Sequence, residues 1–392
     1  MTERYGFKPE LKSVRSLLLV IIAALLISCG SKEDAVLPIE QTVTENAEQK
    51  DTLLSSEITK VKTTESESVD ADESVQVSEE PVVNAEEPDP VTEDFDITLA
   101  FAGDINFDDS WSVMSYYHAM GDDLDTVIDP EYLKLMREAD IMWINNEFTY
   151  SNGGSPLPGK AYTFRARPEN VNILHEMGVD IVGLANNHIY DYGKEAFLDT
   201  LDTLKEAGIP YVGAGHDLDE AKSPVYLDAD GVTVAYVAAS RAEKTKMTPQ
   251  ATDTEPGILR CYDNTLFLQS IEEAAKNADY VIALPHWGTE YSTILEEAQI
   301  KGAVEYIEAG ADAVIGAHTH CLQETTEIEG KPVVYSLGNF WFNDKTLDTM
   351  LFEIHLSGTK TTDPDGNTEV SITNVTTDKI MGIQSGCVTI RR

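Results

Sequence analysis

Short apolar runs recur along the second part of the chain, and several of them stop abruptly at polar side chains. The run Val182-Gly-Leu-Ala185 stops at Asn186-Asn187-His188, and the segment that follows has apolar residues at helical spacing up to Gly208. This pattern predicts a short buried strand, a polar turn and an amphipathic helix. Ligands of open α/β sheets gather beyond the carboxyl ends of the strands, so we expect the triplet to face a functional crevice.

The same patterns predict strands and helices over the whole region from residue 97 onward. The predicted strands are Ile97–Gly103, Ile141–Ile144, Ile181–Ala185, Tyr211–Gly215, Val225–Leu227, Val232–Ala239, Tyr280–Pro285, Asp312–Ala317 and Pro332–Leu337, with further hairpins from Met350 onward. The predicted helices are Pro130–Glu138, Pro168–Met177, Lys194–Ala207, Asn264–Asn277 and Glu296–Ala309. Strands that alternate with helices indicate parallel units, and the turn Asp228-Ala-Asp-Gly231 indicates a hairpin. We therefore expect an α/β fold with mixed sheets. Residues 241–260 are weakly patterned and are predicted to form a long loop near the site, with a lid as one interpretation.

The start of the chain has a different pattern. Residues 1–15 carry four basic side chains, and residues 16–28 are apolar and uncharged up to Cys29. A basic segment followed by an apolar segment too short to span a membrane comfortably is typical of an export signal. Leu26-Ile-Ser-Cys29 resembles a bacterial lipobox, so we predict a signal peptide at residues 1–29 and lipid attachment at Cys29, with an uncleaved anchor as the alternative. Either reading places the rest of the protein outside the cytoplasm, anchored to the cell membrane.

Residues 30–96 are predicted to form a disordered acidic linker, and residues 97–392 the folded domain. The linker has 20 acidic and 4 basic residues, and it lacks any helical or alternating period. Such a composition cannot bury enough apolar surface to fold. The formal net charge of the chain is -41, which argues against nucleic acid as a partner because Lys and Arg must neutralise the phosphates.

The cysteines leave the disulfide question open. After Cys29 the chain has Cys261, Cys321 and Cys387, and an exported domain could pair two of them or keep them as free thiols.

Five predicted strands end in side chains that bind metals or transfer protons. Asp104 and Asn106 follow the first strand, and Glu147, Asn187 and His286 follow three others. The last strand delivers His318 and His320, which share one face because side chains alternate along a strand. These residues are too many for one tetrahedral zinc. They predict two adjacent divalent ions that share a carboxylate, with Glu147 as the bridge and manganese, iron or zinc as the metals.

Other polar residues are assigned to proton transfer and to substrate binding. His188 lies next to the predicted ligand Asn187, and we predict that it protonates the leaving group. Arg165 and Arg167 follow a loop rich in Gly and Pro and are candidates for holding a carboxylate or phosphate, with ordinary surface ion pairs as the alternative. Glu290 and Asn339 are also assigned to substrate binding.

The ordered motifs resemble those of a known family. Gly103-Asp104, Asn145-x-Glu147, Asn186-Asn187-His188-x-x-Asp-x-Gly, His286-Trp-Gly-x-Glu290, Gly316-x-His318-x-His320 and Ser336-Leu-Gly-Asn339-Phe appear in that order. The set resembles the bacterial capsule synthesis protein CapA family, which is linked to poly-γ-glutamate capsules and related to the calcineurin-like metallophosphoesterases. The resemblance covers about residues 97–343.

The resemblance implies a four-layer α/β/β/α sandwich. The first reading of the function is an envelope-anchored, metal-dependent hydrolase acting on a phosphoester or on an amide of an anionic envelope polymer such as poly-γ-glutamate. It places Asn106 where the wider superfamily has His, and Glu147 where it has Asp. A second reading is a membrane-anchored component of a poly-γ-glutamate synthase complex that binds metal and polymer without turnover, with capsule synthase membrane subunits as partners. A third reading is a solute-binding lipoprotein, which gives no reason for the clustered His and Asn residues.

Overall fold

The computed structural model describes residues 89–242 and 247–392. The predicted signal peptide, the lipid attachment at Cys29 and the predicted linker up to residue 88 lie outside the described residues. No helix within the described residues is long and apolar enough to cross a membrane.

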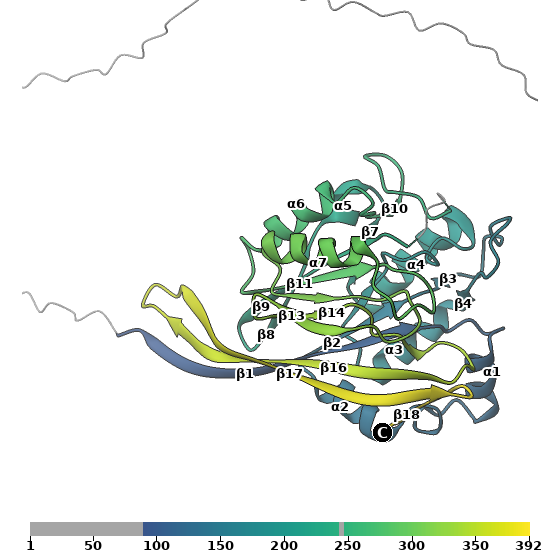
Figure 1. Cartoon of the computed structure of the whole chain (residues 1–392), viewed down its shortest axis with the longest axis horizontal. Coiled ribbons are helices and arrows are strands. Elements are labelled where there is room, and N and C mark those ends of the chain that lie inside the picture. Colours follow the sequence, from purple (N-terminus) through teal and green to yellow (C-terminus); the bar gives the residue numbers. More distant parts are fainter. Residues whose placement is uncertain (1–88, 243–246) are drawn as a thin grey trace, which may run out of the picture. The chain divides into compact units, whose positions relative to one another are not determined.

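The first sheet has eight strands, in the order β18-β17-β16-β1-β2-β5-β6, and β15 also pairs with β1 (Figure 1). The strands are β1 Val91–Ile105, β2 Ile141–Asn146, β5 Ile181–Gly183, β6 Tyr211–Val212, β15 Asn339–Trp341, β16 Leu347–Thr362, β17 Thr368–Ser385 and β18 Val388–Arg391. Strands β1, β2, β5 and β6 run parallel, whereas β1, β16, β17 and β18 pair antiparallel. The sheet is therefore mixed, as the sequence predicts.

The second sheet has six strands, in the order β13-β14-β12-β11-β9-β8. They are β8 Val225–Ala229, β9 Val232–Ser240, β11 Tyr280–His286, β12 Ala313–Ile315, β13 Thr325–Ile328 and β14 Lys331–Val334. The four central strands are parallel, and both edge strands join by antiparallel pairing. Two short pairs complete the strands: β3 Thr149–Tyr150 with β4 Arg165–Ala166, and β7 Ala214–Gly215 with β10 Gly257–Ile258.

The two sheets face each other, and helices cover the outer face of each (Figure 1). The helices are α1 Ser112–Ala119, η1 Leu124–Thr126, α2 Pro130–Glu138, η2 Pro168–Val171, α3 Asn172–Met177, α4 Gly193–Ala207, α5 Leu218–Lys222, α6 Thr265–Ala274 and α7 Glu297–Glu308. One core cluster lies between the sheets, a second between the first sheet and α1 to α4, and a third between the second sheet and α6 and α7. The predicted four-layer α/β/β/α arrangement is confirmed.

Strand β9 shows why these runs are apolar throughout. Val234 and Tyr236 point into the core between the sheets, while Ala235 and Val237 point to the helix layer. A parallel strand that is buried on both faces reads as a continuous apolar run rather than an alternating one. The continuous apolar run therefore also indicates that β9 lies inside the sandwich.

The ends of two helices follow from local chemistry. The carboxylate of Asp129 accepts a hydrogen bond from the amide of Glu131 at 3.0 Å, and Pro130 opens α2, so the helix has the predicted bounds. Helix α4 ends where Gly208 adopts a φ of +72°, a conformation that suits glycine.

The start of the domain differs from the prediction. Strand β1 begins at Val91, so residues 91–96 belong to the fold and not to the linker. The reason is that Phe95 is buried and its backbone pairs with Gly358 of β16, a partner too distant in sequence to be read from the local acidic composition.

Three smaller differences concern helices and loops. Helices α1 and α5 were not predicted, and part of the predicted loop at residues 241–260 forms β10, which pairs with β7.

Cys261, Cys321 and Cys387 are free thiols, and Cys261 and Cys387 are buried.

Candidate metal centre

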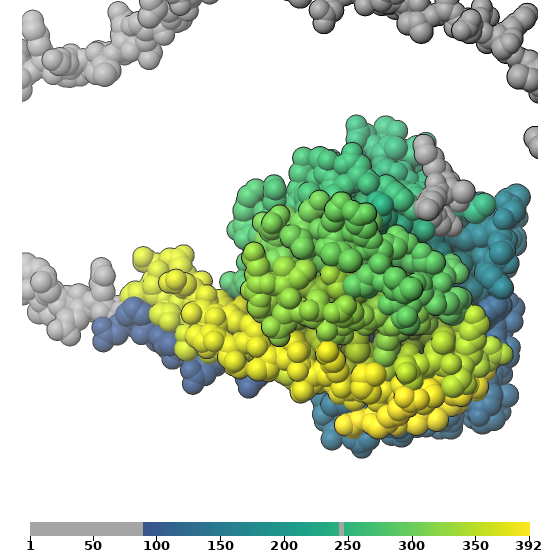
Figure 2. Space-filling view, viewed as in Figure 1, coloured from purple at the N-terminus to yellow at the C-terminus, as the bar shows by residue number. Residues whose placement is uncertain are grey.

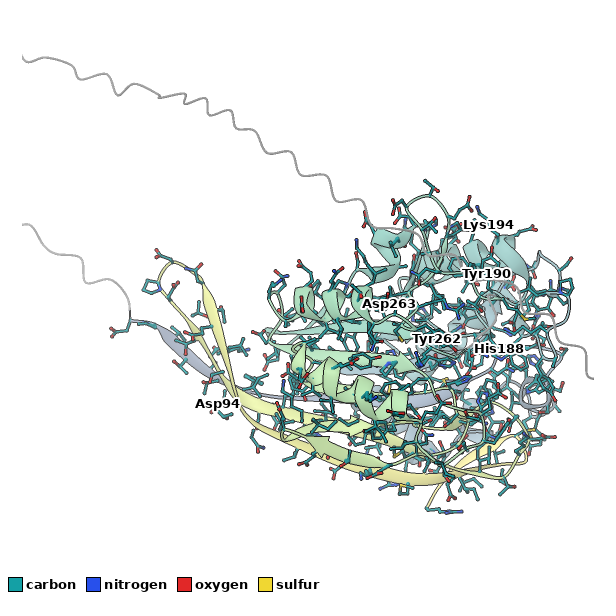
Figure 3. The ribbon with its side chains drawn as sticks, turned by 45° about the horizontal axis from the view of Figure 1, so that its top comes forward. Asp94, His188, Tyr190, Lys194, Tyr262 and Asp263 are labelled. Atoms are coloured by element: carbon teal, nitrogen blue, oxygen red, sulfur yellow. The ribbon has the colours of Figure 1, made fainter. Side chains whose placement is uncertain are left out.

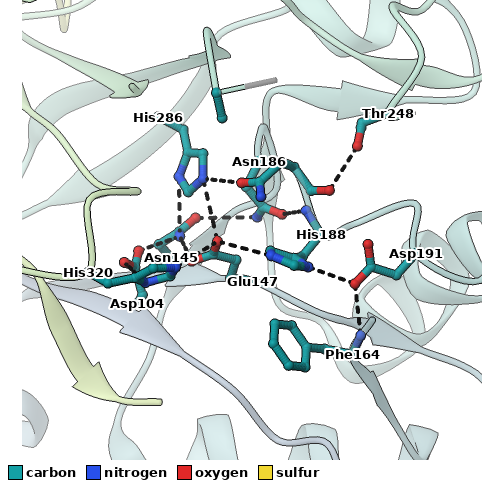
Figure 4. Close-up of polar contacts among 12 residues, drawn as sticks. Asp104, Asn145, Glu147, Phe164, Asn186, His188, Asp191, Thr248, His286 and His320 are labelled. Carbon is teal, nitrogen blue, oxygen red and sulfur yellow. Dashed lines mark hydrogen bonds and ion pairs between the residues drawn. The ribbon is translucent and has the colours of Figure 1, made fainter. Parts of the chain in front are cut away.

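The ends of β1, β2, β5, β11 and β12 bring the predicted ligands together at one edge of the sandwich (Figure 4). Asp104 lies near the end of β1, where an added Cβ on Gly103 would sit 1.8 Å from the carbonyl oxygen of Gly338. Glycine is therefore required for this close approach. The six side chains are all buried; they are Asp104, Glu147, Asn187, His286, His318 and His320.

Five of these side chains form two ligand groups that share Glu147. Glu147, His286 and His318 form one group, and Asp104, Glu147 and His320 form the other, with the ligand atoms of each group within 4.8 Å of one another. Asn187 extends the first group, because its Oδ1 lies 2.8 Å from Nε2 of His286. The arrangement suits two neighbouring ions held by one bridging carboxylate.

The carboxylate of Glu147 shows that the donor set fits a cation. Its Oε1 is buried and has no hydrogen-bond partner among the residues that the structure describes. The Nε2 atoms around it belong to His286 at 3.6 Å, His188 at 4.0 Å and His320 at 4.0 Å. A buried carboxylate oxygen without a partner is costly, and a metal ion at this point would satisfy it together with the imidazoles.

Burial shapes the protonation of the ligands. It raises the pKa of Glu147 well above its usual range, and the neighbouring charge of Asp104 raises it further. Burial also lowers the pKa values of His286 and His318, and the surrounding imidazoles lower them further. Both histidines therefore favour the neutral form, which is the form that binds metals.

Two asparagines hold the ligands in place. The Nδ2 group of Asn145 donates to Oδ1 of Asp104 at 2.7 Å and to Oε2 of Glu147 at 3.3 Å. The Oδ1 atom of Asn339, a residue predicted to bind substrate, accepts from Nδ1 of His320 at 2.8 Å. A proton on Nδ1 leaves Nε2 of His320 free for a metal, so Asn339 supports a ligand.

Asn106 is also buried, but its oxygen has a local role. Its Oδ1 accepts a hydrogen bond from the amide of Asp108 at 2.9 Å, and its Nδ2 has no hydrogen-bond partner in residues 89–242 and 247–392. The atom of Asn106 that would bind a metal is thus already engaged by its own turn. The structure gives Asn106 less support as a ligand than the other six residues.

His188 lies beside the ligand groups and is held by a buried carboxylate (Figure 4). Its Nδ1 is 2.7 Å from Oδ2 of Asp191, which also accepts from the amide of Phe164 at 2.8 Å. The second oxygen of Asp191 pairs with Nζ of Lys160 at 2.6 Å. Nε2 of His188 therefore faces the centre. Asp191 was assigned no role from the sequence. Its position three residues after His188, within one turn, was a usable signal for their contact.

The predicted anion-binding arginines have partners within the chain. Arg167 makes two hydrogen bonds of 3.0 Å to the carboxylate of Asp109. Nη1 of Arg165 donates to the carbonyl of Gly153 at 2.7 Å, and its guanidinium lies over the ring of Tyr192. Arg167 thus agrees with the alternative reading of an ordinary surface ion pair, whereas the partners of Arg165 are a backbone carbonyl and an aromatic ring. Glu290 is exposed and lines a cavity beside His318.

A third group of potential ligands lies away from this centre. His355 is 3.6 Å from Glu353 and 3.3 Å from Asp378, on β16 and β17. Asp378 is exposed, and the distances fit an ion-paired cluster on the outer face of the first sheet.

Comparison with known proteins gives a consistent family assignment. The family model described as bacterial capsule synthesis protein PGA_cap matches residues 98–344, which include every candidate ligand. The chain is 34% identical over 201 residues to the PGA biosynthesis protein CapA of Bacillus subtilis, covering 50% of this chain and 52% of that protein. It is 36% identical over 198 residues to the capsule biosynthesis protein CapA of Bacillus anthracis, covering 49% and 47%. The chain thus spans about half the length of the curated relatives it matches.

Among solved structures, the NAD nucleotidase NadN of Haemophilus influenzae aligns with a TM-score of 0.38 at 13% identity. The alignment covers 74% of this chain and 57% of that one.

Proposed function

Since the chain belongs to the bacterial capsule synthesis protein family, we propose that it is a metal-dependent hydrolase of capsule or poly-γ-glutamate biosynthesis. The substrate would be a phosphoester or an amide of an anionic envelope polymer. The observation that carries the proposal is the unpartnered Oε1 of Glu147, which lies between two ligand groups made of buried carboxylates and imidazoles.

The donor set suits two divalent ions. Asp104, Glu147 and His320 would hold one ion, and Glu147, Asn187, His286 and His318 would hold the other. Mixed oxygen and imidazole ligands favour manganese, iron or zinc. When bound, such a pair lowers the pKa of a coordinated water and stabilises negative charge on the attacked centre.

The residues of the chain supply proton transfer and orientation. Asp191 holds Nδ1 of His188 at 2.7 Å, so a proton on Nε2 points toward the centre. From there His188 would protonate the leaving oxygen or nitrogen. The backbone carbonyl of Asn187 accepts from Oγ1 of Thr248 at 2.9 Å and from Lys160, which fixes the turn that carries both Asn187 and His188.

A second candidate function is binding of metal and polymer without turnover, as part of a synthase complex. The observation that favours it is Asn106, whose oxygen is used by its own turn. The ion at Asp104 and His320 would then have fewer ligands and weaker binding. Lipid attachment at Cys29, an extracytoplasmic location and contact with synthase membrane subunits belong to both proposals, and they rest on the pattern of residues 1–29.

The first test is the metal content of the purified chain, measured by mass spectrometry beside the His318→Ala/His320→Ala double variant. We expect about two equivalents of a transition metal in the wild type and a large loss in the variant. Absence of metal from the wild type, even after reconstitution with manganese, iron and zinc, would reject the hydrolase.

The second test separates the two candidate functions. Hydrolysis of phosphoesters and γ-glutamyl polymers is measured for the wild type and for His188→Ala. Activity that disappears in the variant while its metal content persists supports the hydrolase. Tight polymer binding without any product supports the binding component.

A further inference from the structure

A cavity of about 410 Å³ opens directly onto the candidate metal centre. His318, which belongs to one of the two ligand groups that contain Glu147, forms part of the cavity wall. The remaining wall contains Arg241, Tyr262, Glu290 and Glu296. A substrate bound at the metals would therefore extend into a space with charged side chains of both signs.

Arg241 is placed by the strand that carries His286. It follows β9 directly, and its amide donates a hydrogen bond to the carbonyl of His286 at 2.9 Å. Its guanidinium lies over the ring of Tyr262 at 4.7 Å, and Nη1 donates to the carbonyl of Tyr262 at 3.4 Å. Tyr262, whose ring lies under this guanidinium, is labelled in Figure 3. The backbone of Arg241 is thus fixed relative to a metal ligand.

The guanidinium of Arg241 differs from that of Arg167 in its partners. Arg167 is paired with a carboxylate, whereas Arg241 makes no ion pair with any carboxylate of the described residues. Arg241 therefore remains able to form paired hydrogen bonds with a carboxylate of a ligand.

The two acidic residues of the cavity are not equivalent. Glu296 caps helix α7 and accepts a hydrogen bond from Oγ1 of Thr289 at 2.6 Å, so its carboxylate has internal partners. Glu290 is exposed and has no hydrogen bond or ion pair within the described residues. The cavity thus offers one guanidinium and one carboxylate to a ligand.

We propose that this cavity binds the amino-terminal end of an amino-acid polymer. Arg241 would hold the carboxylate of the end residue, and Glu290 would hold the ammonium group of the same residue. A phosphate group would pair with Arg241 but would be repelled by Glu290, whereas an end group that carries both charges is complementary to both residues. The inference rests on the proposed function and narrows it, because it favours an amide substrate over a phosphoester.

Calorimetric titration of the metal-loaded His188→Ala chain tests this subsite without turnover. The probes are the dipeptide γ-glutamylglutamate, the same dipeptide acetylated on its amino group, and inorganic phosphate. We expect the free dipeptide to bind about 10-fold more tightly than its acetylated form, because acetylation removes the ammonium group that Glu290 would hold. Tighter binding of phosphate than of the dipeptide would overturn the proposal.

Variants made in the same background assign the two charges. Arg241→Gln is expected to weaken dipeptide binding at least about 10-fold, and Glu290→Gln to abolish the preference for the free amine. Arg391→Gln is the matched control, since Arg391 lies on β18 and faces Glu131 at 3.8 Å. Arg241→Lys keeps the positive charge and serves as the variant if Arg241→Gln does not fold. Unchanged dipeptide binding in Arg241→Gln, or in Arg241→Lys, which loses the paired N–H donors of the guanidinium, would reject the subsite.

The outcome remains separable from that of the hydrolase proposal. Dipeptide binding that depends on Arg241, in a chain whose wild type shows no hydrolysis, would reject the hydrolase and keep the subsite. Hydrolysis by the wild type, together with dipeptide binding that does not depend on Arg241, would support the hydrolase and reject the subsite.

Discussion

Glu147 is a buried carboxyl group whose pKa is raised well above its usual range by burial and by the charge of Asp104. Within the described part of the chain its Oε1 has no hydrogen bond, and the nearest imidazole nitrogen is 3.6 Å away. Because the carboxylate serves both ligand groups, its removal affects both ion positions at once.

The Glu147→Gln variant should therefore lose most of the metal while the metal-free protein gains stability. We expect the free energy of unfolding of the metal-free variant to rise by about 1–3 kcal/mol, since burial disfavours the ionised form of Glu147 and the amide of Gln has no such form. Metal analysis and urea unfolding in chelator measure the two effects. Glu353→Gln is the control, because Glu353 is also buried but lies outside the centre. Full metal retention by Glu147→Gln would contradict the bridging role.

Asp191 is predicted to act through His188. Asp191→Asn should lower the turnover number about 10²-fold and alter its pH profile, because the imidazole loses the partner that orients it. Metal content should stay at the wild-type level. The exposed Asp202→Asn on α4 is the control. Loss of metal together with activity would show that Asp191 supports the structure of the centre instead.

The sequence was informative where one residue reveals its own role. A polar side chain directly after a buried apolar strand must be satisfied by something, so Asp104, Glu147 and His286 could be predicted from their local context. Asn145 and Arg241 could not be assigned, because their roles depend on partners contributed by other segments. Arg165 and Arg167 were selected for their charge, and their partners Gly153 and Asp109 became visible only in three dimensions.

At the scale of elements, β1 shows how far the fold extends into the acidic segment. Phe95 is 4% exposed and belongs to the core between the sheets, whereas Asp94 on the same strand is exposed (Figure 3). Phe95→Ala should lower the free energy of unfolding by about 2–4 kcal/mol, because it removes a buried aromatic ring. Asp94→Ala should change it by less than about 0.5 kcal/mol. Equal effects of the two changes in urea unfolding would place Phe95 outside the core.

Helix α1 is joined to its surroundings by a pH-dependent ion pair. The hydrogen bond to Asp122 raises the pKa of His118, and Asp109 adds to this effect. Because the pKa in the folded state is above that in the unfolded state, this contribution is complete at low pH and is lost as the pH rises through the folded-state value.

His118→Gln should therefore destabilise the protein at pH 5.5 by about 0.2–1 kcal/mol, the range for exposed ion pairs, and by much less at pH 8.5. Urea unfolding at the two pH values checks this. His175→Gln serves as the comparison on α3. A larger effect of His118→Gln at pH 8.5 would contradict the assignment.

Elements buried on both faces were predicted with their approximate bounds, whereas hairpins were predicted from Met350 onward without the length of their strands. The central strands are apolar throughout because both faces are covered. Beyond Leu356 the strands β16 and β17 are rich in Thr, Ser, Asp and Lys and are partly or fully exposed, so they carry little hydrophobic signal. Strand β16 pairs with β17 on one side and with β1, which is distant in the sequence, on the other. Composition alone does not predict these pairings.

At the scale of the whole molecule, the candidate ligands come from both sheets. Asp104 and Glu147 belong to the first sheet, and His286 and His318 to the second. Ions bound there would join the two halves of the sandwich. Binding at 100 times the dissociation constant adds about 2.7 kcal/mol of stability for one site.

Removal of metal by a chelator should therefore lower the melting temperature and increase amide exchange at the strand ends of both sheets. The hairpin beyond Leu356 serves as the internal control, because it lies away from the centre (Figure 1). Restoration by manganese or zinc should reverse both changes. A melting temperature that does not respond to chelation in a metal-containing sample would contradict this linkage.

The start of β1 and the hairpin of β16 and β17 project from the body of the domain as a ribbon (Figure 2). Eleven residue pairs, from Val91 with Thr362 to Phe101 with Phe352, join β1 to β16. Tension applied at Val91 along the strand would load these hydrogen bonds in shear, so they would have to break together rather than one after another. The domain should thus resist pulling through its amino-terminal side better than a sideways pull, a difference that force spectroscopy with two attachment geometries would measure.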